Sequence, residues 1–196
     1  MMPKERNNQN KALRLFFALL PDEKTVAELQ QWQTHVTGKK TPMENLHMTL
    51  FFLGNQPEKH LPAFRRFMER LSFEPIEIRL DKIGFFPKIG LSWAGPSETP
   101  VSLWKLFEET RQFLVPAYLK DKSENFRPHI TLARHSTKPE TKTGSPIIWK
   151  AKRLVLMQSI PGGEQGKHPE YRILHEKTGY VSNSGNQSPA VSLRNT

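Results

Sequence analysis

The chain has 196 residues, which suits one domain of ordinary size, and 36% of them are hydrophobic, enough to form a core. It has no cysteine, which excludes a disulfide framework and a thiolate metal site, and no apolar run of about 18 residues that would predict a membrane span. The formal net charge of +10 favours a polyanionic partner. The first residues lack the apolar segment of a signal peptide, so we expect a cytoplasmic protein without a membrane partner.

The first half of the chain predicts four elements in the order strand, helix, strand, helix. The apolar run at residues 11–20 predicts a strand. Asp22 is a suitable N-cap for a helix that Gly38 should end. A second helix is expected over residues 58–71, where apolar residues recur at helical spacing.

The second half predicts mainly strands, at residues 76–81, 89–94, 149–159 and 171–177. A helix is expected at 100–114, and Pro116 should end or kink it. Because antiparallel signals dominate, this order predicts an α+β fold rather than a doubly wound one. We expect one bilobal domain over residues 11–178, with disordered termini at 1–10 and 182–196.

One four-residue pattern occurs twice, as His47-Met48-Thr49-Leu50 and as His129-Ile130-Thr131-Leu132. Two copies should arise by chance in roughly one such chain in a thousand. Each copy lies in a predicted strand, where alternation directs His and Thr to one face and the apolar residues to the core. One copy in each half predicts two pseudo-symmetric antiparallel sheets with outer helices, their motif strands side by side around a central cleft.

The chemistry that best suits two imidazoles and two hydroxyls is in-line displacement at phosphorus. Near neutral pH, one neutral histidine can take a proton from the attacking water while one protonated histidine gives a proton to the departing oxygen. The threonine hydroxyls can donate hydrogen bonds to the non-bridging phosphate oxygens, where charge develops.

The chain resembles the 2H phosphoesterases, in particular the RNA 2′,3′-cyclic phosphodiesterases that are also described as 2′-5′ RNA ligases. The segments that carry the resemblance are RLFFALLP, NLHMTLFFLG, GFFP with the following LSWAG, and FRPHITLAR, then Ser159, Gly163, Tyr171 and Leu174, in the order of the family. The similarity extends over about residues 13 to 175. One departure is Gly90, which stands where the family often has Arg, with Lys88 nearby.

The resemblance implies an activity and a role for each matching residue. It implies a bilobal α+β fold that needs no metal or nucleotide cofactor and opens a 2′,3′-cyclic phosphate at an RNA end to a 2′-phosphomonoester, with reversible 2′-5′ ligation. His47 would be the proton donor and His129 the proton acceptor, roles that two symmetric histidines could exchange in the ligating direction. Thr49, Thr131 and Arg134 would contact the phosphate.

Other residues have alternative roles. Arg127 is a candidate substrate-binding residue, or equally a solvated loop charge. We expect structural or surface roles for the remaining histidines, which are His35, His60, His135, His168 and His175. We expect core positions for the strand aromatics Phe16, Phe17, Phe51 and Phe52.

Alternative functions also stay open. The substrate could be a small cyclic phosphate or a 2′-5′ oligonucleotide rather than an RNA 3′ end, and the protein could be a non-catalytic RNA-binding module. A metallohydrolase with His47 and His129 as ligands is disfavoured, because no carboxylate or third histidine stands near either motif at a ligand spacing. We expect the protein to act as a monomer.

Overall fold

The computed structural model describes residues 12–119, 126–140, 145–162 and 168–180. The expected disordered termini at 1–10 and 182–196 lie outside these residues. Within the described ranges, no helix is long and apolar enough to cross a membrane.

Antiparallel strands form a main sheet and a separate two-stranded sheet. The main sheet has the order β10 (Glu170–Thr178), β9 (Arg153–Ile160), β1 (Ala12–Leu20), β3 (Met48–Pro57), β7 (Ile130–Arg134), β6 (Leu91–Gly95) and β5 (Lys82–Phe86), with the short β2 (Lys39–Lys40) paired to β7. The small sheet pairs β4 (Ile76–Leu80) with β8 (Ile147–Ala151).

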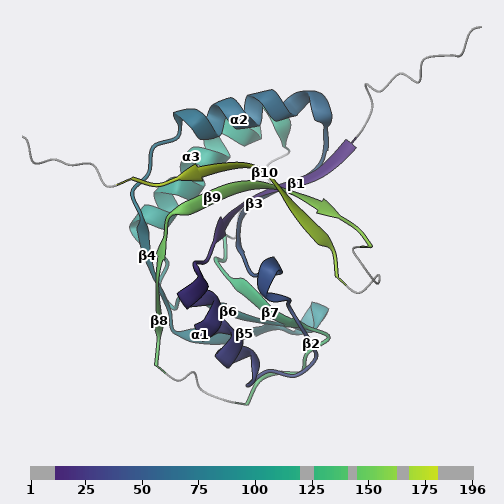
Figure 1. Ribbon diagram of the computed structural model, residues 1–196, viewed down its shortest axis with the longest axis vertical. Coiled ribbons are helices and arrows are strands. Elements are labelled where there is room, and N and C mark those ends of the chain that lie inside the picture. The colour runs from purple at the N-terminus through teal and green to yellow at the C-terminus, as the bar shows by residue number, and fades with distance from the viewer. Residues whose placement is uncertain (1–11, 120–125, 141–144, 163–167, 181–196) are drawn as a thin grey trace, which may run out of the picture.

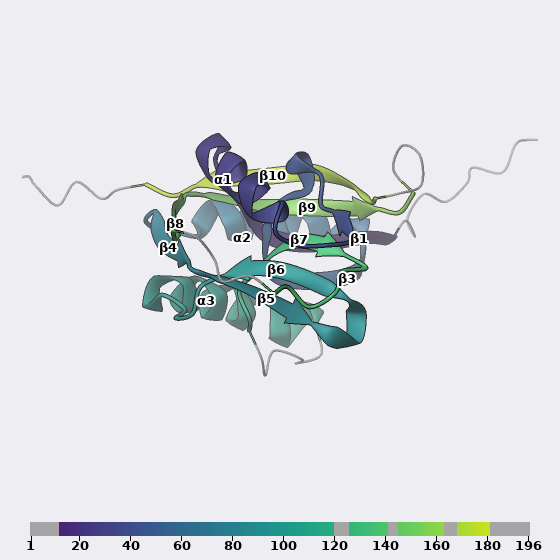
Figure 2. The same cartoon turned by 90° about the horizontal axis from the view of Figure 1, so that it is seen from below.

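In the described part of the chain, three α-helices cover these sheets: α1 (Glu23–Gln33), α2 (Leu61–Arg70) and α3 (Val101–Tyr118). Short 3-10 turns occupy Met43–Asn45, Glu58–His60 and Pro87–Ile89. α1 contacts β7 and β8, α2 contacts β10, and α3 contacts β3. Figure 2 shows α1 and α3 on opposite sides of the strands between them.

The main sheet divides into two lobes that meet at the motif strands. Within the described residues, β3 and β7 share the single register pair Met48 and Ile130. One lobe contains β10, β9, β1 and β3, and the other contains β7, β6 and β5, which lie below the first in Figure 1. Met48, Leu50, Ile130 and Leu132 are all buried in the core, as the motif alternation predicts. The bilobal α+β fold is therefore confirmed.

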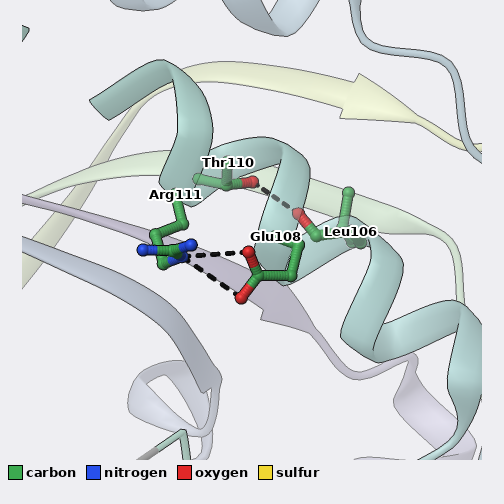
Figure 3. Close-up of polar contacts among 4 residues, drawn as sticks. All are labelled: Leu106, Glu108, Thr110 and Arg111. Carbon is green, nitrogen blue, oxygen red and sulfur yellow. Dashed lines mark hydrogen bonds and ion pairs between the residues drawn. The ribbon is translucent and has the colours of Figure 1, made fainter. Parts of the chain in front are cut away.

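The helices begin and end for local reasons. The Asp22 carboxylate accepts a hydrogen bond from the Thr25 N–H at 2.8 Å, so the predicted N-cap of α1 is confirmed. α1 ends at Gln33 and not near Gly38, because the backbone N–H and the hydroxyl of Thr34 both donate to the Gln31 carbonyl. Side-chain contacts also run along α3, where the Thr110 hydroxyl donates to the Leu106 carbonyl and Arg111 pairs with Glu108 (Figure 3).

Two further element predictions need correction, and one strand was missed. α3 continues through Pro116 to Tyr118, whose ring packs edge-on against Phe64 with centroids 5.0 Å apart and holds the last turn. The predicted strand at 149–159 is two strands, because the chain leaves the half-buried small sheet after β8 and enters the main sheet at β9, between β10 and β1. β5 was not predicted, since Gly84 in its centre looks like a strand breaker.

Candidate active site

Both histidine–threonine pairs line one cavity of about 290 Å³. The side chains of the paired residues Met48 and Ile130 are buried in the core. The residues before and after each of them along the strand therefore point to the opposite face of the sheet. His47 and Thr49 flank Met48, and His129 and Thr131 flank Ile130 in the same way. The cavity therefore lies over the junction of the two lobes, where the motif strands meet.

The repeat includes the way in which each imidazole is held. His47 Nδ1 lies 2.7 Å from the carbonyl oxygen of Asn45, and His129 Nδ1 lies 2.7 Å from that of Arg127. A carbonyl oxygen can only accept, so Nδ1 carries the proton in both rings and Nε2 is the atom that remains for proton transfer. In each case the anchor is the backbone two residues before the histidine, so it does not depend on the side chain there.

Aromatic rings enclose each histidine, but the rings differ between the lobes. The His47 ring contacts Phe16 and Tyr171, each with centroids 5.0 Å apart. The His129 ring contacts Phe86 at 5.2 Å and Trp93 at 6.2 Å. Such packing restricts ring orientation and removes water from the imidazole.

This enclosure disfavours the charged form of both histidines. Burial lowers the pKa of His47 from 6.5 to about 4; the hydrogen bond to Asn45 opposes this shift, whereas the charges of His129 and Arg134 add to it. Burial also lowers the pKa of His129, again against a backbone hydrogen bond and with the help of Arg134. Both rings are therefore neutral near pH 7 when the cavity is empty.

The rest of the cavity wall is suited to an anion. It includes cations and hydroxyl groups from both lobes, among them Arg14, Arg134, Thr41, Ser159 and Tyr171, and the imidazole of His168. None of the described residues that line the cavity is Asp or Glu. The wall therefore offers donors and positive charge to a bound group such as a phosphate.

The structure brings together five of the six predicted site residues. Arg134 lines the cavity with both motifs, and its guanidinium lies near the Tyr171 hydroxyl. Burial raises the pKa of Tyr171, and the charge of Arg134 and its side-chain hydrogen bond oppose this shift. Arg127 does not line the cavity; its carbonyl holds His129, and the residue borders a second hollow. At Gly90, the departure from the family pattern, φ is +56°, a left-handed conformation that glycine adopts without strain.

Several lining residues were missed by the sequence reasoning. Phe52 was expected in the core but is 48% exposed, with Arg14 over its ring at 5.0 Å. Irregularities in the β1–β3 pairing change the strand's face between Thr49 and Phe52, which simple alternation does not reveal. His168 reaches the cavity from the segment before β10, and its pKa is lowered by burial and by the charges of Lys39 and Arg134.

No group of three or more His, Cys, Asp or Glu that could hold a metal ion occurs in the part of the chain that the structure describes. The cavity instead combines two imidazoles with free Nε2 atoms, hydroxyl donors and guanidinium charge. These are the parts needed to transfer two protons around an anion.

Comparison with known proteins finds relatives of this chain. The model of the 2'-5' RNA ligase superfamily matches residues 21–159. The RNA 2',3'-cyclic phosphodiesterase of Thermus thermophilus is 31% identical over 186 residues, which covers 84% of this chain and 89% of that protein. The protein of the same name from Escherichia coli is 27% identical over 140 residues, or 69% of this chain and 80% of that one. The crystal structure of E. coli LigT complexed with 3'-AMP has a TM-score of 0.73 at 23% identity, covering 87% of this chain and 100% of that chain, and shows the shared fold.

Proposed function

This chain belongs to the 2'-5' RNA ligase superfamily, and on that basis and from the cavity we propose that it is an enzyme that hydrolyses RNA 2′,3′-cyclic phosphate ends to 2′-phosphomonoesters. The observation that carries the proposal is the convergence of both His-x-Thr pairs and Arg134 on one cavity, where no described residue contributes a lining carboxylate. The names of the Thermus and E. coli relatives support the same substrate.

In the proposed mechanism, His129 Nε2 takes a proton from water as the water oxygen attacks phosphorus. The bond between phosphorus and the 3′ oxygen breaks on the opposite side, and that oxygen takes a proton from His47 Nε2. Thr49, Thr131 and Arg134 donate to the non-bridging oxygens, where negative charge develops. The product is a 2′-phosphomonoester with a free 3′ hydroxyl, and the two histidines end with exchanged protonation states.

Because the pKa values of both histidines are lowered, binding of the substrate has a role in protonating the histidine that acts as the acid. Burial and neighbouring positive charges keep both imidazoles neutral before binding. An anionic phosphate beside them stabilises the imidazolium form and so raises the pKa of the nearer ring. We therefore propose that His47 gains its proton together with the substrate.

We propose that the reaction needs no metal, because two imidazoles supply proton transfer while Arg134 and the threonines stabilise the developing charge. Ligation would follow if the 5′ hydroxyl of a second RNA took the place of the attacking water: His129 would take its proton, the bond between phosphorus and the 3′ oxygen would break with a proton from His47, and a 2′-5′ phosphodiester would form. Reversal of this step would release the 5′ hydroxyl and restore the cyclic phosphate. One chain supplies both motifs, and we propose that it works as a single domain and as a monomer.

The test is an assay of an oligoribonucleotide that ends in a 2′,3′-cyclic phosphate, in excess chelator, with the phosphate position in the product determined. We expect turnover to a 2′-phosphate, and none for a matched double variant with His47→Ala and His129→Ala. A 3′-phosphate product or full loss of turnover in chelator would contradict the mechanism. Tight binding of the RNA without any product would favour the alternative of an RNA-binding module.

A further inference from the structure

A second hollow, of about 280 Å³, borders His129, and His47 is not among the described residues that line it. Its lining includes Lys82, Phe86, Trp93, Thr99, Phe126 and Arg127. His129 lines both the hollow and the catalytic cavity, so the two spaces adjoin at this residue.

The register of the sheet places the floor of the hollow on the catalytic face. Thr131 pairs with Trp93, and Trp93 pairs with Gly84, so these three residues form one row across β7, β6 and β5. Lys82 and Phe86 lie two residues from Gly84 on either side and share its face. The lining of the hollow therefore continues the face of the sheet that carries Thr131, which also lines the catalytic cavity.

Close packing in this row explains the glycine in β5. A Cβ atom added at Gly84 would lie 2.0 Å from the Trp93 indole, so the ring rests against bare backbone. Lys82 Nζ lies 5.9 Å from the centroid of the same ring. The hollow thus has a floor of aromatic rings with a cation at its edge.

The charge of the hollow resembles that of the cavity. Lys82 and Arg127 are both exposed, and no Asp or Glu occurs among the described residues that line it. Arg127 is also the residue whose carbonyl anchors His129. The hollow therefore offers two positive charges and a hydroxyl, from Thr99, next to a catalytic group.

We propose that this hollow binds the phosphodiester immediately upstream of the cyclic phosphate, with Lys82 and Arg127 paired to its charge. This inference rests on the proposed function. A 2′,3′-cyclic phosphate ends its chain, so an RNA held at that end extends only in the 5′ direction, where the next charged group is that phosphodiester. The substrate class is then an oligonucleotide, preferred over a cyclic mononucleotide.

The experiment compares kcat/KM for a cyclic mononucleotide with that for a short RNA that has the same 3′ end. Lys82→Ala should lower the ratio of RNA to mononucleotide kcat/KM about fivefold and reduce its dependence on salt, as expected for a lost phosphate contact. The matched control is Lys150→Ala, an exposed lysine on β8, which lines neither space and should leave the ratio unchanged.

A neutral methylphosphonate at the upstream linkage provides the decisive comparison. Wild-type enzyme should lose its preference for this RNA, and Lys82→Ala should cause no further loss. An unchanged ratio of RNA to mononucleotide kcat/KM in Lys82→Ala would overturn the proposal. If both kcat/KM values fell equally, the hollow would be assigned to the terminal nucleotide instead.

Failure of the proposed function would be recognised separately, as absence of turnover for every cyclic phosphate in the wild-type protein. The hollow would then be tested by fluorescence anisotropy with a 3′-phosphorylated RNA. Weaker binding of this RNA to Lys82→Ala than to Lys150→Ala would still support the upstream contact, and equal binding would overturn it.

Discussion

The two motif lobes hold their histidines in the same way but surround them differently. Each Nδ1 atom donates to the carbonyl two residues earlier at 2.7 Å. His47 packs against Phe16 and Tyr171 and lines the catalytic cavity. His129 packs against Phe86 and Trp93 and lines both that cavity and the hollow with Lys82. The two lobes therefore orient their imidazole rings with the same backbone hydrogen bond, but they surround the rings with different side chains.

The comparison shows that the orientation of each imidazole ring and its proton affinity have different structural causes. A strand repeat can reproduce a backbone hydrogen bond, because that bond depends only on local chain geometry. Proton affinity depends on burial and charge, which the two lobes provide with different residues; burial is the main cause of the lowered pKa at both histidines and takes the pKa of His47 to about 4. Two like motifs can therefore have unlike roles in one reaction.

The largest expected effect comes from removing each imidazole. His47→Ala and His129→Ala should each reduce turnover about 10²–10⁴-fold, the usual contribution of one positioned acid or base. A cyclic phosphate with sulfur in place of the bridging 3′ oxygen separates the roles, because a thiolate leaves without a proton. This substrate should restore activity to His47→Ala and not to His129→Ala. Rescue of the other variant alone would reverse the assignment.

Replacing the two threonines compares the phosphate donors of the lobes. Thr49→Val and Thr131→Val keep side-chain shape and remove the hydroxyl. Each should lower kcat by about 10²-fold with little change in KM, since the lost hydrogen bond strengthens in the transition state. Steady-state kinetics on the same RNA end measures both. A loss confined to one variant would show that only one lobe stabilises the developing charge.

The pH dependence tests the lowered proton affinity of both lobes. The base must be neutral and the acid protonated, so activity falls below the pKa of the base and above that of the acid. Because both pKa values are lowered from 6.5, the maximum of kcat/KM should lie below pH 6.5. Bound phosphate raises these values, so the kcat profile should lie at higher pH. Coincident profiles would contradict substrate-assisted protonation of the acid.

The smallest expected effect concerns a contact found beside His47. The Asn45 side chain donates to the Pro169 carbonyl at 3.2 Å and ties the segment before β10 to the first motif. Asn45→Ala should cost about 1 kcal/mol, a shift in the melting temperature of about 2–4 °C. It should leave the histidine anchor in place, because that anchor is a backbone carbonyl. Asn55→Ala, an exposed position on β3, is the control, and equal melting temperatures would refute the contact.

Local sequence patterns predicted those parts of the fold that depend on residues close together in the sequence. The Asp22 cap, the alternation in residues 76–80 and the burial of Met48 and Ile130 follow from neighbouring residues, and the structure agrees. Predictions were wrong where a distant partner decides. Gly84 is a strand residue because Trp93 packs on it, and the end of α3 is held by contacts to Phe64.

By itself, the sequence determined the repeated His-x-Thr pattern, the faces of the motif strands and the antiparallel α+β class, because these depend on the period of two in a strand and on residue type. Only the tertiary structure decided that both motifs and Arg134 border one cavity, that Arg127 faces another, and that His168 joins the first. Proximity across the fold comes from strand pairing between distant segments. The surroundings of each imidazole, and with them its pKa, arise only when those segments pack.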